Sequence, residues 1–143
     1  MPGIVVGVDG SGHSRKALER GVAEAAAHGA ALIVLTVHQA VRDVYGSVSH
    51  YQDDAALTDK AKEAAQAETD QVLAAAGSQP TSVTVTAVHG LPVDELVKAS
   101  EGADMIVLGR RGMGGFVRLL MGSVSSQVAQ HALCPVLIVP GAD

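Results

Sequence analysis

The sequence predicts an α/β fold in which helices cover both faces of a mostly parallel sheet. Apolar, β-branched runs alternate with amphipathic segments through all 143 residues, without a repeat or a linker. This alternation is typical of successive βαβ units. Hydrophobic residues make up 48% of the chain but aromatic residues only 2%, so the core must consist of Val, Ile, Leu and Ala, as in sheets buried on both faces. We expect residues 1–143 to form one domain.

The first predicted strand is the β-branched run Ile4–Val8, which the turn Asp9–Gly12 ends. A helix follows, because Leu18, Val22, Ala25 and Ala26 share one stripe. Ser11 or Ser14 caps its start, and Gly29 ends it.

The second predicted strand is Ala31–His38. Residues 39–52 have no clear period, and we interpret them as a loop that covers a site. A long Ala-rich helix is predicted over Asp53–Ala76, followed by Gly77. Its predicted inner face consists of Leu57, Ala61, Ala64, Ala65 and Val72.

The second half of the chain predicts three more strands. Ser82–His89 alternates Val and Thr, which is typical of an edge strand. The helix after it starts with Pro92 at its first position and ends at Gly102. Asp104–Gly109 is the fourth strand and Cys134–Pro140 the last, with a helix from Ser123 to about His131 between them.

Composition excludes several classes of function. The net charge of −5 argues against a general nucleic-acid binder, which needs a basic face. One cysteine, Cys134, excludes an internal disulfide framework and a cysteine-based zinc cluster. Together with an N-terminus that lacks the pattern of a signal peptide, this predicts a cytoplasmic protein without a membrane anchor. The six histidines show no zinc-ligand spacing on a helix.

The segment Gly109–Ser125 carries the strongest chemical signal. Its glycines allow backbone N–H groups to approach an anion closely, and Gly122-Ser123 stands where a helix begins. The N–H groups and dipole of a helix N-terminus favour a phosphate. The segment matches neither the P-loop nor the dinucleotide fingerprint. A glycine-rich turn that only packs closely is the alternative interpretation.

Two interpretations are also open for Asp9, which ends the first predicted strand beside glycines. Its carboxylate is suited to bind a ribose or a metal ion. It is equally suited to close an Asx-turn or to cap a helix.

The glycine segment resembles the motif of the ATP-binding branch of the universal stress protein family. The matching residues are Gly109 and Gly112, then nine residues, then Gly122-Ser123. Similar family features are the opening Val8–Ser11, the Gly90-x-Pro92 turn and Cys134-Pro135-Val136. The resemblance covers essentially the whole chain.

The resemblance implies a three-layer α/β/α fold like a single Rossmann-type half, with five parallel strands in the order 3-2-1-4-5. It also implies a homodimer that pairs the last strands, Pro135–Val139. ATP would lie across the ends of the first and fourth strands. Asp9 would then approach the ribose or a phosphate-bound Mg²⁺ or Mn²⁺, with Val8 close by and Val37 giving backbone contacts to adenine. The implied ribose and phosphate ligands are Gly109, Arg110, Gly112, Gly122, Ser123, Val124 and Ser125.

The sequence favours a protein that binds ATP over an enzyme that transfers or hydrolyses its phosphates. Phosphoryl transfer requires a positioned metal, cationic stabilisation and an oriented nucleophile, and the sequence offers only Asp9 and the arginines for these roles. We expect a stress or regulatory protein with little or slow hydrolysis and no catalytic residue. The alternatives are a slow ATPase and a structural or partner-binding dimer without nucleotide.

Overall fold

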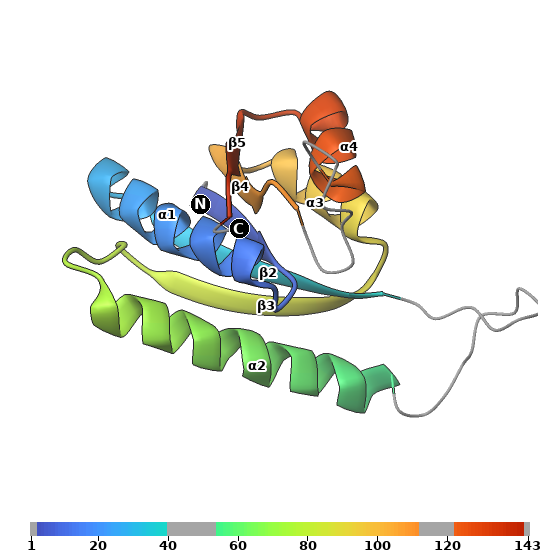
Figure 1. Ribbon diagram of the computed structural model, residues 1–143, viewed down its shortest axis with the longest axis horizontal. Coiled ribbons are helices and arrows are strands. Elements are labelled where there is room, and N and C mark those ends of the chain that lie inside the picture. Colours follow the sequence, from blue (N-terminus) through green and yellow to red (C-terminus); the bar gives the residue numbers. More distant parts are fainter. Residues whose placement is uncertain (1–2, 40–53, 112–121, 142–143) are drawn as a thin grey trace, which may run out of the picture.

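The computed structural model describes residues 3–39, 54–111 and 122–141. Strands and helices alternate strictly through these ranges (Figure 1). The strands are β1 (Gly3–Val8), β2 (Ala31–Gln39), β3 (Val83–Gly90), β4 (Met105–Gly109) and β5 (Val136–Val139). The helices are α1 (Gly12–His28), α2 (Asp54–Ala75), α3 (Pro92–Ser100) and α4 (Ser123–His131).

The five strands form one parallel sheet in the order β3-β2-β1-β4-β5. The predicted α/β fold and its strand order are therefore confirmed, and β3 lies at an edge as its alternating sequence predicts. In the central strand, Val6 pairs with Val34 of β2 on one side and with Val107 of β4 on the other. The first strand is thus enclosed by strands from both halves of the chain.

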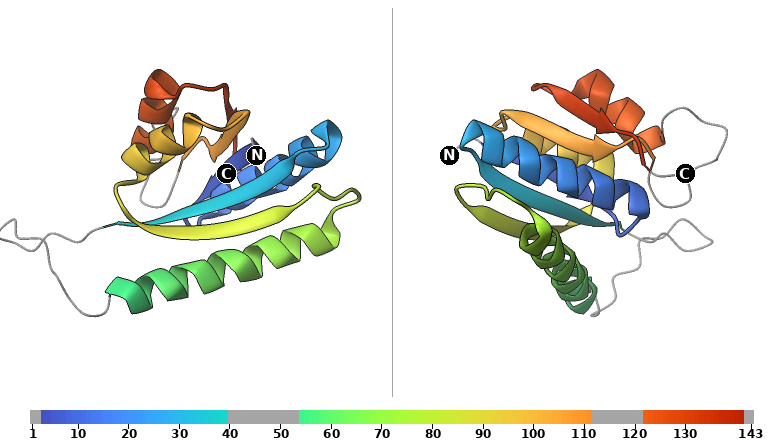
Figure 2. Two further views of the ribbon diagram at one scale, coloured as in Figure 1. Left: turned by 180° about the vertical axis from the view of Figure 1, so that it is seen from behind. Right: turned by 60° about the vertical axis from the view of Figure 1, so that its left-hand side comes forward.

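A hydrophobic cluster lies on each face of the sheet. Ile4, Val6 and Val8 pack with residues of α1 and α2, whereas Val5 packs with residues of α3 and α4. In the right-hand view of Figure 2, α1 lies in front of the strands and α3 and α4 lie behind them. Burial on both faces explains why β1 is a continuous apolar run rather than an alternating one.

Helix α1 begins and ends at predicted residues. Its N-cap is Ser11, whose Oγ accepts a hydrogen bond from the Ser14 N–H at 3.1 Å. Its C-cap is Gly29, in the left-handed region with φ of 59°, a conformation that costs glycine little. The caps satisfy backbone groups that the helix itself leaves without partners.

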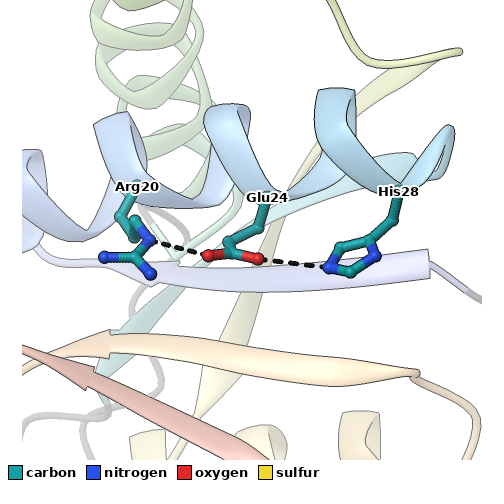
Figure 3. Close-up of polar contacts among 3 residues, drawn as sticks. All are labelled: Arg20, Glu24 and His28. Atoms are coloured by element: carbon teal, nitrogen blue, oxygen red, sulfur yellow. Dashed lines mark hydrogen bonds and ion pairs between the residues drawn. The ribbon is translucent and has the colours of Figure 1, made fainter.

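Three side chains on the solvent-facing side of α1, those of Arg20, Glu24 and His28, form a row of polar contacts (Figure 3). Arg20 Nε donates to Glu24 Oε1 at 2.7 Å, and His28 Nε2 lies 3.2 Å from Glu24 Oε2. The hydrogen bond from Arg20 lowers the pKa of Glu24 below its ordinary value, against a smaller opposing effect of desolvation. The residues are four apart, the spacing that places side chains next to each other on a helix.

The inner face of α2 differs from the prediction. Ala65 and Val72 are buried as expected, but Leu57 is 42% exposed and Ala64 is also exposed. The buried position between Ala65 and Val72 is Thr69, which the sequence pattern did not indicate. Its Oγ1 donates to the Ala65 carbonyl at 2.7 Å, so the hydroxyl enters the core with its hydrogen-bonding requirement met.

Several predicted boundaries shift by one or two residues. β5 begins at Val136 rather than Cys134, and α3 ends at Ser100 with Glu101 as its C-cap, just before Gly102. Pro92 occupies the first turn of α3 as predicted. Among the described helices, none is both long and apolar enough to span a bilayer.

Candidate functional site

The candidate site lies at the carboxyl edge of the sheet, where β1 and β4 end side by side. The chain leaves β1 towards β2 on one side, and it returns to β4 on the other side. Such a reversal of strand order opens the crevice in which α/β proteins bind ligands. Both α1, which begins at Gly12, and α4, which begins at Ser123, start at this edge.

The turn after β1 is closed by its own side chains. The Ser11 N–H donates to Asp9 Oδ1 at 2.9 Å, and the Asp9 N–H donates to Ser14 Oγ at 3.2 Å. Gly10 has φ of +84°, a region that residues with a side chain rarely adopt. Asp9 therefore forms the Asx-turn that was one of its two predicted roles, and it is exposed. Its role towards ribose or metal stays a prediction.

Gly109, at the end of β4, is required by packing. A Cβ at this position would lie 2.8 Å from the carbonyl oxygen of His13 and 2.9 Å from its carbonyl carbon. The first turn of α1 therefore approaches the end of β4 at a distance that only glycine permits. For Gly109 the packing interpretation applies, and this contact holds the two strand ends and the start of α1 together.

The Arg110 carbonyl holds the start of α4 against the end of β4. It accepts hydrogen bonds from the Gly122 N–H at 2.7 Å and from Ser125 Oγ at 2.9 Å. The Arg110 N–H in turn donates to the Val139 carbonyl of β5 at 2.9 Å. Ser125 is only 3% exposed, so its hydroxyl positions the helix. Gly112 lies outside the described residues.

The start of α4 has the features of an anion site. Its N-cap is Gly122, which makes no side-chain capping bond, and its first turn contains no acidic residue. Ser123 is exposed and Val124 is half-buried. The first N–H groups of a helix have no acceptor within the helix, and among the described residues no side chain caps the start of α4. These residues therefore fit a phosphate group.

Two charged residues that the sequence analysis did not single out lie near Asp9. Desolvation raises the pKa of Glu68 on α2, the negative charge of Asp9 raises it further, and the positive charge of Arg15 opposes both. Arg15 Nη1 also donates to Gln71 Oε1 at 3.0 Å. No pattern in the sequence indicates Glu68, because its place beside the β1 turn depends on how α2 packs across the sheet.

The remaining predicted ligands are backbone positions. Val8 ends β1 and is buried, so only its main chain is available at the edge. Val37 of β2 pairs with Val88 of β3, and its side chain packs in the cluster below α3 and α4. The structure thus brings together Val8, Asp9, Gly109, Arg110 and the start of α4 at one edge of the sheet. Val37 lies on β2, the strand next to β1.

A second concave region lies between α1 and α2. This groove has a volume of about 470 Å³, and alanines from both helices form much of its lining. Its lining includes Arg15 and Glu19 near the start of α1, but most of its residues lie farther along both helices. Its alanine and valine side chains are apolar and its lining includes no N-terminal helix turn of α4, so it differs from the strand ends in chemistry.

Residues 2–140 match the model of the Universal stress protein family. The chain belongs to this family. It is 33% identical over 138 residues to a universal stress protein of Thermus aquaticus, a match that covers 95% of this chain and 96% of the relative. It is also 33% identical over 153 residues to a universal stress protein of Mycobacterium tuberculosis. The chain spans about half of that relative, 48% of its length.

Solved structures of this family have the same fold. The universal stress protein UspA from Lactobacillus plantarum superposes with a TM-score of 0.77 at 26% identity, covering 96% of this chain and 97% of that one. A universal stress protein crystallised in complex with cAMP superposes with a TM-score of 0.69 at 29% identity, covering 99% and 98% of the two chains.

Proposed function

We propose that this chain binds an adenine nucleotide, ATP, at the carboxyl edge of β1 and β4, and that it acts as a stress-response or regulatory protein. The start of α4 carries this proposal: a glycine N-cap, an exposed Ser123 and a first turn without acidic residues. The relative crystallised with cAMP supports an adenine nucleotide as the ligand class.

In this proposal the backbone N–H groups of Ser123, Val124 and Ser125 bind phosphate oxygens, with the Ser123 hydroxyl as an additional donor. Gly122 gives the phosphate room to approach. Arg110 and Gly112, which follow β4 in the sequence, contribute to phosphate binding, and Val37 contacts adenine through its backbone. Val8 and Asp9 approach the ribose, and Asp9 is the residue suited to a phosphate-bound Mg²⁺. The bound nucleotide supplies the negative charge that the start of α4 is suited to hold.

We further propose that ATP is held with little hydrolysis. A catalyst needs a base or a positioned nucleophile, and Asp9, the carboxylate that ends β1, is engaged in its own turn through the Ser11 N–H. The same engagement makes Asp9 a binding and positioning residue. Slow ATPase activity is the alternative, and phosphate release separates the two.

Thermal melting with and without ATP and Mg²⁺ tests the binding proposal. Nucleotide at about 100 times its dissociation constant should add about 2.7 kcal/mol to the free energy of unfolding. A shift without phosphate release supports a nucleotide holder, and a shift with release supports the slow ATPase. An unchanged melting temperature at saturating ATP contradicts both, and leaves a structural or partner-binding dimer.

A substitution at the N-cap of α4 tests the location. Gly122→Val should abolish ATP binding, because the added side chain blocks the approach to the helix N–H groups. The matched control is Gly102→Val, just after α3 at the opposite edge of the sheet, where a Cβ would meet nothing within 4 Å. The control should bind ATP normally. Normal affinity in the Gly122 variant would refute the proposed site.

We also propose a homodimer that pairs the last strands through Pro135–Val139. β5 is the final strand in the sheet order, and its residues Val136–Val139 are all half-buried in the single chain. An apolar edge strand is a liability unless something covers it, and a second copy would do so. Analytical ultracentrifugation tests this, and a monomer at micromolar concentration would contradict it.

A further inference from the structure

A pair of histidines at the carboxyl ends of β2 and β3 has no part in the proposed nucleotide site. His38 and His89 are direct register partners on the two parallel strands. Their ring centres are 5.3 Å apart, with 37° between the ring planes. His38 is half-buried and His89 is exposed, so both rings are accessible from solvent at this edge.

Strand alternation fixes the face on which the two rings lie. Leu32 and Val34 precede His38 at two-residue steps, and Val85 precedes His89 in the same way. These three residues belong to the cluster on the α1 and α2 face of the sheet. The pair therefore lies on that face, and β1 separates β2 from β4 and the start of α4.

We propose that His38 and His89 form a binding site for a divalent transition-metal ion such as Zn²⁺. The separation of the rings carries the argument. With a metal–nitrogen distance of about 2.05 Å and a ring centre about 1.2 Å behind the nitrogen, two imidazoles at a tetrahedral angle have centres roughly 5.3 Å apart. The observed 5.3 Å matches this separation, so a common ion requires only that side-chain rotation turns one nitrogen of each ring towards it.

The donor set selects the metal. Imidazole is the ligand that Zn²⁺, Ni²⁺ and Cu²⁺ share, whereas Mg²⁺ and Ca²⁺ prefer oxygen ligands. Within the described part of the chain, no cluster of three or more His, Cys, Asp or Glu residues could hold a metal ion. The described part of the chain thus supplies two protein ligands, His38 and His89, and water can complete the coordination. Such a site binds metal reversibly and leaves positions for a further ligand.

The fixed strand register makes this pair more effective than two histidines on a mobile surface. Eight successive residue pairs join β2 and β3, and His38–His89 is the seventh of them. The backbones are therefore held at their separation before the metal arrives, and only side-chain rotamers remain to be ordered. A metal that bridges the strands would stabilise this edge of the sheet.

Isothermal titration of the intact chain with ZnCl₂, without nucleotide, tests the proposal. We expect one Zn²⁺ site whose affinity falls at least tenfold in His89→Ala, since one of the two protein ligands is lost. The matched control is His131→Ala at the exposed end of α4, which should retain wild-type affinity. MgCl₂ should not compete.

His89→Ala carries the test because His89 is exposed, so its loss should leave the melting temperature without metal unchanged. His38→Ala is the second variant, and histidine ring signals in NMR spectra provide an independent measurement. Zn²⁺ should shift the ring signals of His38 and His89 together. Equal Zn²⁺ affinity in His89→Ala and wild type, or the absence of Zn²⁺ binding by the wild type, would show that the two rings only contact each other.

Discussion

Helices α1 and α4 begin at the same edge of the sheet, but they differ in how their first N–H groups are capped. At the start of α1, Ser11, Ser14 and Asp9 satisfy one another and the backbone through hydrogen bonds of 2.9–3.2 Å. At the start of α4, the N-cap is a glycine without a capping side chain. The N-terminus of α1 is capped by side chains of the protein, whereas the N-terminus of α4 is suited to a hydrogen-bond acceptor from a ligand.

A third helix shows that a missing cap alone does not make a phosphate site. The N-cap of α3 is Leu91, which also makes no side-chain capping bond, but its first turn contains Asp94 and Glu95. Their negative charges already complement the helix dipole and would repel a phosphate. Among α1, α3 and α4, the helices whose N-caps the structure describes, only α4 combines the absence of a cap with the absence of acidic residues.

The contact that joins the two termini should give the largest effect. Gly109→Ala would place a Cβ 2.8 Å from the His13 carbonyl oxygen, so the backbone of α1 would have to move. We expect a loss of about 1–3 kcal/mol in the free energy of unfolding without nucleotide, as for other overpacked sites. Urea unfolding measures it, with Gly12→Ala as the control because a Cβ there meets nothing within 4 Å. Equal losses in both variants would contradict a specific packing role.

Removing one serine at each terminus should separate stability from binding. Ser11→Ala removes the cap of α1 and should cost about 1 kcal/mol of stability. Ser123→Ala removes an exposed side chain without a capping role, so its stability should stay within about 0.5 kcal/mol of wild type. Its ATP affinity should fall. A larger loss of stability in Ser123→Ala than in Ser11→Ala would contradict the proposed difference in capping between α1 and α4.

Glu68 should make the α1 terminus sensitive to pH. Desolvation raises its pKa above the ordinary 4.5, so its contribution to stability is present below that pH and is lost as pH rises through the raised value. Glu68→Gln should therefore match wild type under acid conditions and melt at a higher temperature at neutral pH. Glu63→Gln, exposed on the same helix, is the control. A lower melting temperature for Glu68→Gln at neutral pH would contradict this assignment.

Loss of the Arg20–Glu24 interaction on α1 should change the melting temperature least, because these side chains lie at the solvent-facing side of the helix. The hydrogen bond from Arg20 lowers the pKa of Glu24 below 4.5, so its contribution is present above that pH and is lost as pH falls through the lowered value. Glu24→Gln should lower the melting temperature slightly at neutral pH and have no effect in acid. Glu19→Gln, whose ion pair with Lys16 is longer at 3.7 Å, should change it less. An effect larger than that of Ser11→Ala would contradict the ordering.

The fold was predictable because its signals are local. Apolar runs mark four strands and an alternating run marks β3, Gly29 marks the end of α1, and Pro92 marks the start of α3. The inner face of α2 was predicted less well. Thr69 enters the core because its hydroxyl bonds to a carbonyl one turn earlier, and a pattern that scores hydrophobicity alone misses such a residue.

The site was predictable in its location but not in the role of each residue. The motif identified the start of α4, but it could not show that Gly109 is needed for contact with His13, nearly a hundred residues earlier. Likewise, Ser125 reads as a phosphate ligand in the sequence, whereas its hydroxyl bonds to the Arg110 carbonyl. These roles depend on distances between segments that the chain order does not reveal.

The central position of β1 also has a consequence for folding kinetics. Ile4 pairs with Leu32 of β2 and with Met105 of β4, so one side of β1 closes a short loop and the other closes a loop of about a hundred residues. Longer loops cost more entropy to close, and parallel pairing between distant segments is slow. The β1–α1–β2 unit should therefore gain protection from amide hydrogen exchange early in refolding. The β4 side, and with it the start of α4, should gain protection last.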